Sequence, residues 1–293
     1  MVKVVCQMVG QYIYVDCASP SFIININIKN KYMKTAICVL IKDEQDYLDE
    51  WLEHHFNLGI DEIFLYEDYG SNSHLDIIKP YGDKVHLNSI DIIFNSDNPD
   101  KNVVNTGERS QIQLFNYFPQ MYKDEFDWVL FNDLDEFLIL KQPLHELLDE
   151  YKDETALFLR WKWYSASGHI NKPTGKVVDN FTKAVTTTFD WGWTFKSFLN
   201  CKKFKKWEKE LHKAEGGVYP LFDWGGHKAW LNHYFTKSWE EWKTKILSRG
   251  DSMPGHRRIE QFFLLNRDML PIKEQLMSEI TEHYKGEKKK SKV

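Results

Sequence analysis

The sequence predicts an α/β protein with a mostly parallel central sheet and an irregular second half. Short apolar runs of strand length, at 35–41 and 62–67 among others, alternate with segments in which apolar residues recur at helical spacing. This strand–helix order favours parallel pairing with right-handed crossovers. After about Trp163 the alternation weakens, and the chain up to Trp230 is rich in aromatic residues, Gly, Lys and Thr. Ligands of such sheets bind at the carboxyl ends of the strands, so a site is expected there.

Each predicted element rests on a local pattern. Residues 35–41 form a continuous apolar run that is typical of a strand buried on both faces. Residues from Leu48 to His55 show helical spacing, and Ser238 with Glu241 forms a capping box that opens a later helix. Further strands are predicted at 62–67, 84–90, 127–132 and 156–161, and further helices at 75–79, 109–122, 143–151, 238–249 and 257–265.

The chain is expected to divide into an N-terminal extension, one large domain and a charged tail. The extension is poorly specified, although the alternation at 23–29 is compatible with an edge strand. The tail is rich in lysine and typical of a solvated terminus. The predicted boundaries are 1–32 for the extension, 33–275 for the domain, with its two halves at 33–162 and 163–275, and 276–293 for the tail.

Composition and charge exclude several classes of protein. The 293 residues, 42% of them hydrophobic, can bury a large core, which excludes a disordered chain. A net charge of -5 provides no overall positive field that would attract nucleic acid, so we expect no nucleic-acid partner. The four cysteines are widely spaced and form no C-x-x-C pair, which argues against a zinc knuckle or a disulfide framework. No apolar run approaches the roughly 20 residues of a membrane span, so we expect a cytoplasmic protein, soluble or peripheral to a membrane.

Two acidic residues at the end of a predicted strand are the strongest sign of chemistry. Asp133 and Asp135 follow the apolar run 127–132, and residues two apart on an extended chain project to the same side. Two carboxylates at that spacing can chelate a hard divalent cation such as Mg²⁺ or Mn²⁺. Such an ion would neutralise the charge of a nucleotide diphosphate. Acidic triplets also cap helices or face solvent, and the position at the carboxyl end of a strand favours the metal role.

Several segments follow one another in a distinctive order: Ala36–Glu44, Leu48–His55, Gly59–Tyr66, Trp128–Leu138 and Asn232–Ser238, with Lys245 and Arg249 following. Taken together and in this order, they resemble the family 2-like and family 92-like glycosyltransferases. The resemblance implies a GT-A type fold, an Mn²⁺ or Mg²⁺ ion, a nucleotide-sugar donor, most simply a UDP-sugar, and a glycan or lipid-linked acceptor.

Site residues are carried over from this resemblance position by position. Asp133 and Asp135 would hold the metal and the donor diphosphate, and His233 is the candidate third metal ligand, with His212 and His227 as weaker alternatives. Glu67 and Asp68 stand where the family more often has an Asp-Asn pair. Most of these side chains also have structural explanations, such as a first-turn acid or a solvated cation. The candidate donor-binding residues are Glu44, Glu67, Asp68, Arg109, Asp133, Lys196 and Lys237, with Gln113 and Arg249 as further possibilities.

An inverting transfer, which we expect, needs a general base on the acceptor side of the donor. Asp223 is the candidate base, with Asp190 and Glu215 as alternatives, and both aspartates lie in Asp-Trp-Gly segments that equally suit tight turns. An acceptor glycan would stack on aromatic rings of the second half. The candidate stacking residues are Trp161, Trp163, Tyr164, Trp191, Trp193, Trp224 and Trp230.

Other functions fit the sequence less well. A phosphatase of the haloacid dehalogenase type needs Thr or Val two residues beyond its second Asp, where this chain has Phe137. A sugar nucleotidyltransferase needs a glycine-rich loop after the first strand, which residues 42–45 do not provide. A catalytically silent carbohydrate-binding protein of the same fold remains the alternative, although binding alone does not require a metal–diphosphate site.

Overall fold

The computed structural model describes residues 3–8, 11–16, 33–41, 45–67, 74–89, 110–185, 195–208, 213–247 and 259–280. The chain forms two compact units, Met1–Tyr32 and Met33–Val293. In the first unit, β1 (Lys3–Met8) and β2 (Gln11–Asp16) form an antiparallel hairpin. The edge strand predicted at 23–29 lies outside the described residues.

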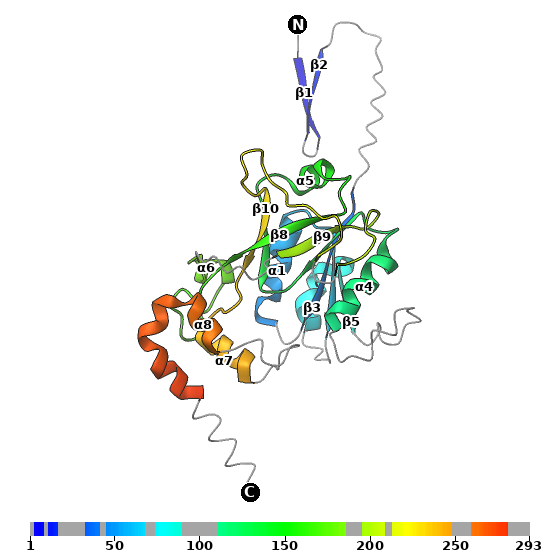
Figure 1. Ribbon diagram of the computed structural model, residues 1–293. Coiled ribbons are helices and arrows are strands. Elements are labelled where there is room, and N and C mark those ends of the chain that lie inside the picture. Colours follow the sequence, from blue (N-terminus) through cyan, green and yellow to red (C-terminus); the bar gives the residue numbers. More distant parts are fainter. Residues whose placement is uncertain are drawn as a thin grey trace. The chain divides into compact units, whose positions relative to one another are not determined.

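The second unit is built on one eight-stranded sheet with the order β5-β4-β3-β6-β9-β8-β10-β7 (Figure 1). Neighbours from β5 to β6 pair in parallel, as do β8 and β10, whereas β9 and β7 pair antiparallel to their neighbours. The predicted mostly parallel sheet is therefore confirmed. The strands are β3 (Thr35–Ile41), β4 (Glu62–Glu67), β5 (Val85–Ser89), β6 (Trp128–Asn132), β7 (Glu136–Leu140), β8 (Ala156–Trp163), β9 (Phe195–Asn200) and β10 (Ala229–His233).

Helices pack on the sheet and beyond its ends, with α5 at the upper end and α7 and α8 at the lower end in Figure 1. Residues 273–280 form a further helix, so the tail predicted from residue 276 overlaps with it. Within the described residues, no helix combines the length and the apolar character needed to cross a membrane. The helices are α1 (Gln45–Asn57), α2 (Leu75–Ile78), η2 (Lys79–Lys84), α4 (Ser110–Tyr122), α5 (Leu144–Glu150), α6 (Val177–Asn180), α7 (Trp239–Leu247), α8 (Ile259–Leu265) and η4 (Arg267–Ile272).

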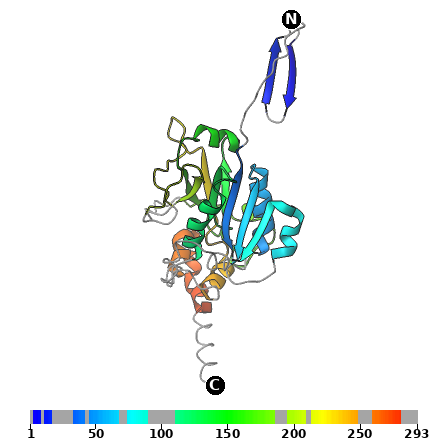
Figure 2. The ribbon, with the colours of Figure 1, turned by 90° about the vertical axis from the view of Figure 1, so that its right-hand side faces the viewer.

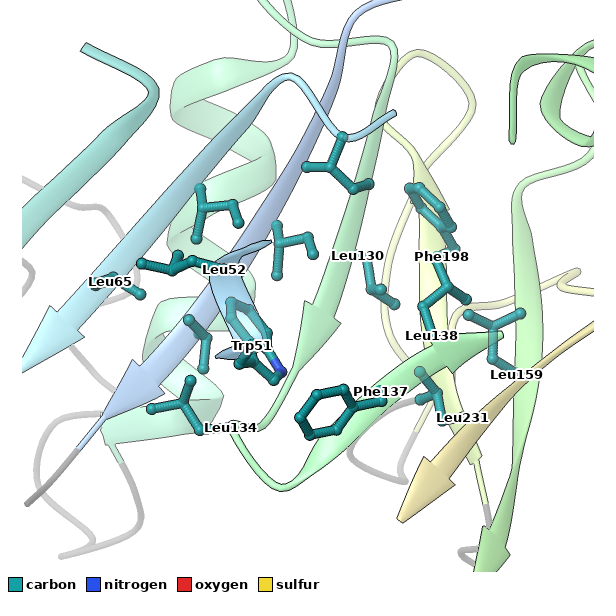
Figure 3. Close-up of a cluster of buried hydrophobic side chains, with 14 of the residues drawn as sticks. Trp51, Leu52, Leu65, Leu130, Leu134, Phe137, Leu138, Leu159, Phe198 and Leu231 are labelled. Atoms are coloured by element: carbon teal, nitrogen blue, oxygen red, sulfur yellow. The ribbon is translucent and has the colours of Figure 1, made fainter. Parts of the chain in front are cut away.

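The core lies on both faces of the sheet because successive side chains of a strand point to opposite faces. In β3, Val39 faces the cluster that contains Trp51 of α1, whereas Cys38 faces the cluster that contains Phe118 of α4. The two helices therefore cover opposite faces (Figure 2). Figure 3 shows Trp51 among the buried side chains of the first cluster, which also includes Leu134. Because the central strands are buried on both faces, their sequences are continuous apolar runs.

The C-terminal helices form a third apolar cluster with α7. Trp239 and Trp242 of α7 pack against side chains from α8, η4 and the last helix. Asn266 is fully buried and connects this layer to the segment after β10. Its amide donates to the carbonyl oxygen of Phe262 at 2.7 Å and to the hydroxyl of Thr236 at 3.3 Å. Residues beyond α8 thus support the segment that follows β10.

Pairing register brings the ends of four strands to one edge of the sheet. In β10, His233 is opposite Glu136 of β7 and beside Trp163 of β8. Because β6, β8 and β10 run in the same direction, their carboxyl ends meet there, and β7 starts from the same place. The predicted acidic segment, 133–136, is the connection between β6 and β7.

Candidate active site

The acidic segment is a tight turn. Strand β6 ends at Asn132, the amide of Glu136 donates to the carbonyl oxygen of Asp133 at 3.1 Å, and β7 begins at Glu136. The extended geometry that predicted a common side for Asp133 and Asp135 is therefore wrong. The turn instead gives the two carboxylates different partners, and it brings a third one, Glu136, into the same region.

Asp135 is buried beside Lys245 and His233. Its carboxylate lies 3.1 Å from Nζ of Lys245 and 3.4 Å from Nε2 of His233, and its carbonyl oxygen accepts a 2.8 Å hydrogen bond from the amide of Tyr234. Burial alone would raise the pKa of Asp135, but the charge of Lys245, together with the contact from His233, outweighs burial and holds it well below its usual range. Asp135 is therefore an ionised, fixed carboxylate.

Glu136 is fully buried, and the sequence analysis missed it. Its Oε2 accepts a 3.2 Å hydrogen bond from the amide of Asp133, whereas Oε1 has no hydrogen-bond partner among the described residues. Burial, together with the charges of Asp133 and Asp135, raises the pKa of Glu136 well above its ordinary value, although Lys196 opposes the shift. Strand alternation would have placed Glu136 on the opposite side from Asp135, and only the turn brings it in.

His233 packs against two indole rings. The ring centroids of Trp161 and Trp163 each lie 4.6 Å from that of the imidazole. Burial lowers the pKa of His233, although the charge of Asp135 opposes this, so the neutral ring, which can ligate a metal, is favoured. Its Nδ1 is buried without a hydrogen-bond partner among the described residues. Two of the predicted sugar-stacking residues, Trp161 and Trp163, therefore pack against this histidine.

Asp135, Glu136 and His233 together form a group with metal-ligand chemistry. One ligand atom from each of them lies within 4.8 Å of the others, and all three residues are buried. Carboxylate oxygens with one imidazole nitrogen suit Mg²⁺ or Mn²⁺. Asp133 is not in this group: its side chain is 36% exposed and its carboxylate lies 2.6 Å from Nζ of Lys196. Asp135, Glu136 and His233 therefore fit a divalent cation.

Two buried lysines lie beside this group. Nζ of Lys196, which is 1% exposed, is 3.8 Å from the carboxylate of Glu136. Burial alone would lower the pKa of Lys196, but Asp133 and Glu136 raise it, so the ammonium stays charged. Lys237 has a positive φ of 50° and is also buried, with its ammonium 4.2 Å from the ring centroid of Tyr47. Its charge contributes to the low pKa of Asp135.

Of the other predicted donor-binding residues, the structure describes Glu67. This carboxylate ends β4 and is bound by Nδ1 of the buried His74. Nine further predicted site residues lie outside the described side chains. They are Glu44, Asp68, Arg109, Gln113, Asp190, Trp191, Trp193, His212 and Arg249.

The structure does not bring Asp223 to the carboxylate group. Asp223 is exposed in a turn closed by a 2.8 Å hydrogen bond from the amide of Phe222 to the carbonyl oxygen of Gly226. This turn precedes the first residue of β10, whereas His233 is the last, and the strand between them is about 13 Å long. The turn contacts α5 instead, where the hydroxyl of Tyr151 donates to the carbonyl oxygen of Leu221 at 3.3 Å.

Four further predicted residues are also away from the carboxylate group. His227 pairs with Leu221 in the same turn. Trp224 is 78% exposed and stacks on Phe222, and Trp230 donates to Asn232 within β10. Glu215 is exposed, 3.6 Å from Lys206. The predicted residues therefore fall into two groups. One lies near the carboxyl end of β10, where the carboxylate group is, and the other lies toward the opposite ends of the strands.

The mostly parallel α/β sheet, with an acidic turn and a histidine at the carboxyl ends of its strands, agrees with the fold that the sequence resemblance implies. A family model, glycosyltransferase family 92, matches residues 33–261. The chain belongs to glycosyltransferase family 92. Comparison with curated protein sequences finds no match.

Solved structures show more distant similarity. Glucosyl-3-phosphoglycerate synthase from Mycobacterium tuberculosis, solved with Mn²⁺, uridine diphosphate and glucosyl-3-phosphoglycerate, is 14% identical; the match covers 45% of this chain and 44% of that one, with a TM-score of 0.29. HddC from Yersinia pseudotuberculosis is 9% identical over 69% of this chain and 77% of that one, with a TM-score of 0.29. 4-Diphosphocytidyl-2C-methyl-D-erythritol synthase is 11% identical over 59% of this chain and 76% of that one, with a TM-score of 0.34. This chain thus spans less than half of the mycobacterial enzyme.

Proposed function

We propose that the protein transfers a sugar from a nucleotide-diphosphate sugar to a glycan or lipid-linked acceptor, with inversion, and that the reaction depends on a divalent metal. The buried group of Asp135, Glu136 and His233 at the carboxyl edge of the sheet carries this proposal. Two of its atoms, Oε1 of Glu136 and Nδ1 of His233, are buried without hydrogen-bond partners among the described residues. Such atoms are expected where a ligand completes the coordination.

The transfer exchanges one bond for another. The acceptor oxygen forms a bond to the anomeric carbon, the bond from that carbon to the diphosphate oxygen breaks, and its electron pair stays on the diphosphate, while the acceptor proton passes to a base. A bound Mn²⁺ or Mg²⁺ would supply positive charge opposite the leaving diphosphate. The chain's own part is to hold Asp135, Glu136 and His233 in place before the donor arrives.

The lysines beside the metal group suit the diphosphate. Lys237 forms no ion pair among the described residues, and its ammonium is confined over the ring of Tyr47. A buried ammonium that forms no ion pair with the described carboxylates can compensate the charge of a bound anion at little cost in reorganisation. We assign Lys237 to the donor diphosphate, and we assign Asp133, the partly exposed carboxylate with Lys196, to the edge of the donor site.

The test is calorimetry with UDP in the presence and absence of Mn²⁺, followed by hydrolysis of a panel of nucleotide sugars. We expect UDP binding to require Mn²⁺, and Asp135→Asn to lower turnover about 100-fold or more because the charge of a proposed metal-binding carboxylate is lost. The control is Asp149→Asn, the same change on the surface of α5, which should leave turnover unaltered.

Metal-independent UDP binding would contradict the proposed metal site. Binding of UDP and Mn²⁺ without turnover on any nucleotide sugar would instead favour the silent carbohydrate-binding alternative.

A further inference from the structure

Strand β7 stands at one edge of the sheet, and helix α1 covers the side of β7 that β10 leaves open. In the strand order, β7 has β10 as its single neighbour. Because β7 and β10 are antiparallel, with Glu136 opposite His233 and Leu138 opposite Leu231, alternate backbone groups of β7 point away from β10. Buried backbone groups of this kind need partners, and no further strand of the described chain provides them.

Three side chains of α1 provide these partners. The indole Nε1 of Trp51 donates to the carbonyl oxygen of Glu136 at 2.8 Å. Nε2 of His54 lies 2.7 Å from the carbonyl oxygen of Leu138, and Nε2 of His55 accepts from the amide of Leu138 at 3.3 Å. Side chains three and four residues apart on a helix share one face, so a single face of α1 follows the backbone of β7 as a neighbouring strand would.

His55 occupies the centre of this arrangement. It is fully buried, and its Nδ1 lies 2.8 Å from the carbonyl oxygen of Trp51, where it can only act as a donor. Nε2 must therefore be an acceptor if the ring is neutral, which matches its two other contacts: the amide of Leu138 and, at 3.5 Å, Nδ2 of Asn132. The ring thus has one defined tautomer, which joins α1, β6 and β7.

The same contacts fix the backbone of the metal group. Nδ2 of Asn132 also donates to the carbonyl oxygen of Glu136 at 3.1 Å, the oxygen that Trp51 binds from α1. The carbonyl of Glu136 is therefore held from two sides, one residue after Asp135. Rotation of this peptide unit would move the side chain of Glu136 relative to His233.

We propose that His55 is a positioning residue that sets the geometry of the metal group by joining α1 and Asn132 to the start of β7. This role rests on the proposed metal site at Asp135, Glu136 and His233. His55 touches neither of the two acidic side chains, and it acts through backbone groups and through Asn132. Removal of groups that orient metal ligands typically weakens metal binding 10- to 100-fold.

The experiment is titration of the full chain with Mn²⁺ alone, without donor, by calorimetry. His55→Phe keeps an aromatic ring against Trp51 but removes both ring nitrogens, and we expect it to weaken Mn²⁺ binding about 10- to 100-fold. The matched control is His54→Phe, the same change on the same helix, which removes a contact with Leu138 but none with Asn132. We expect its Mn²⁺ affinity to stay within about threefold of the wild type.

A second variant decides the matter if His55→Phe does not fold. Trp51→Phe retains a ring in the core but removes the hydrogen bond to the carbonyl of Glu136, and we expect weaker Mn²⁺ binding for the same reason. Wild-type affinity in the folded His55→Phe protein, or in Trp51→Phe when His55→Phe is unfolded, overturns the positioning role while the metal site stands. A wild-type protein that does not bind Mn²⁺ overturns the proposed metal site itself.

Discussion

His55 is a single residue whose protonation links the stability of the fold to pH. Burial lowers the pKa of its imidazole from the usual 6.5 to about 3, and the neighbouring His54 acts in the same direction. The unfolded chain takes up a proton below pH 6.5, but the folded protein does not. The stability that neutral His55 contributes is therefore fully present above pH 6.5 and is lost as the pH falls toward 3.

We expect this loss to amount to about 1.4 kcal/mol for each pH unit below 6.5. Urea unfolding of the wild type and of His55→Phe at pH 7 and pH 5 measures it. Between these two pH values the wild type should lose about 2 kcal/mol more than the variant. Equal losses in the two proteins would show that His55 is protonated in the folded state.

At the same scale, the sequence indicates some site residues and hides others. Asp135 and His233 could be predicted because each ends or follows an apolar run at the carboxyl edge. Glu136 could not, because its burial depends on the turn at 133–136. Asp223 was predicted as the base from its Asp-Trp-Gly context, but local context does not reveal which end of β10 a turn occupies.

Among the elements, α7 shows how a local motif is realised. The hydroxyl of Ser238 donates to the carboxylate of Glu241 at 2.7 Å, and the amide of Glu241 donates back to the hydroxyl at 3.3 Å. The amide of Ser238 also donates to that carboxylate, at 3.1 Å. These bonds satisfy amides at the start of the helix, immediately after the buried Lys237.

Replacement of this cap has a predictable cost. Ser238→Ala should lower the free energy of unfolding by about 1 kcal/mol, because a buried N-cap hydroxyl is lost. Denaturant unfolding measures the change. Ser278→Ala, which removes an exposed hydroxyl bonded to a carbonyl three residues earlier in the last helix, is the comparison and should cost less than about 0.5 kcal/mol. A cost for Ser238→Ala no larger than that of the comparison would contradict the capping role.

The sequence predicts β3, β4 and β6 to within one residue at each end, because their apolar runs are buried on both faces. Strand β9 was missed: its second residue, Lys196, looks like a surface cation in the sequence, yet it is buried against Asp133 and Glu136. Strand β7 was missed because its apolar residues follow the acidic segment without a turn residue such as Gly or Pro between them. In both cases long-range partners, which a local pattern does not contain, decide the structure.

At the scale of the whole molecule, the packed unit extends beyond the family match. That match ends at residue 261, whereas the third apolar cluster uses Phe262, Phe263 and further residues up to Ile280. These side chains cover Trp239 and Trp242, which are 1% and 0% exposed. Each large apolar side chain contributes about 1.5–3 kcal/mol when buried, so the cluster is comparable with the whole stability of a typical domain.

A chain that ends at Gln261 should therefore lose cooperative thermal unfolding and bind a hydrophobic dye such as ANS, because two tryptophans of α7 become uncovered. Calorimetry and dye fluorescence test this. A chain that ends at Ile280 keeps every described residue and should unfold like the full chain. Cooperative unfolding of the shorter chain at an unchanged temperature would show that α7 does not need the C-terminal layer.

The covering of β7 by α1 also bears on self-association. An open sheet edge is a template for strands of other molecules, and proteins usually protect such edges with charges, bulges or covering segments. Here Trp51, His54 and His55 occupy the backbone groups that an incoming strand would need. A substitution that loosens α1 would therefore disturb Asp135 and Glu136 and would also expose the unpaired backbone groups of β7 to strands of other molecules. Loss of activity and aggregation would then begin together.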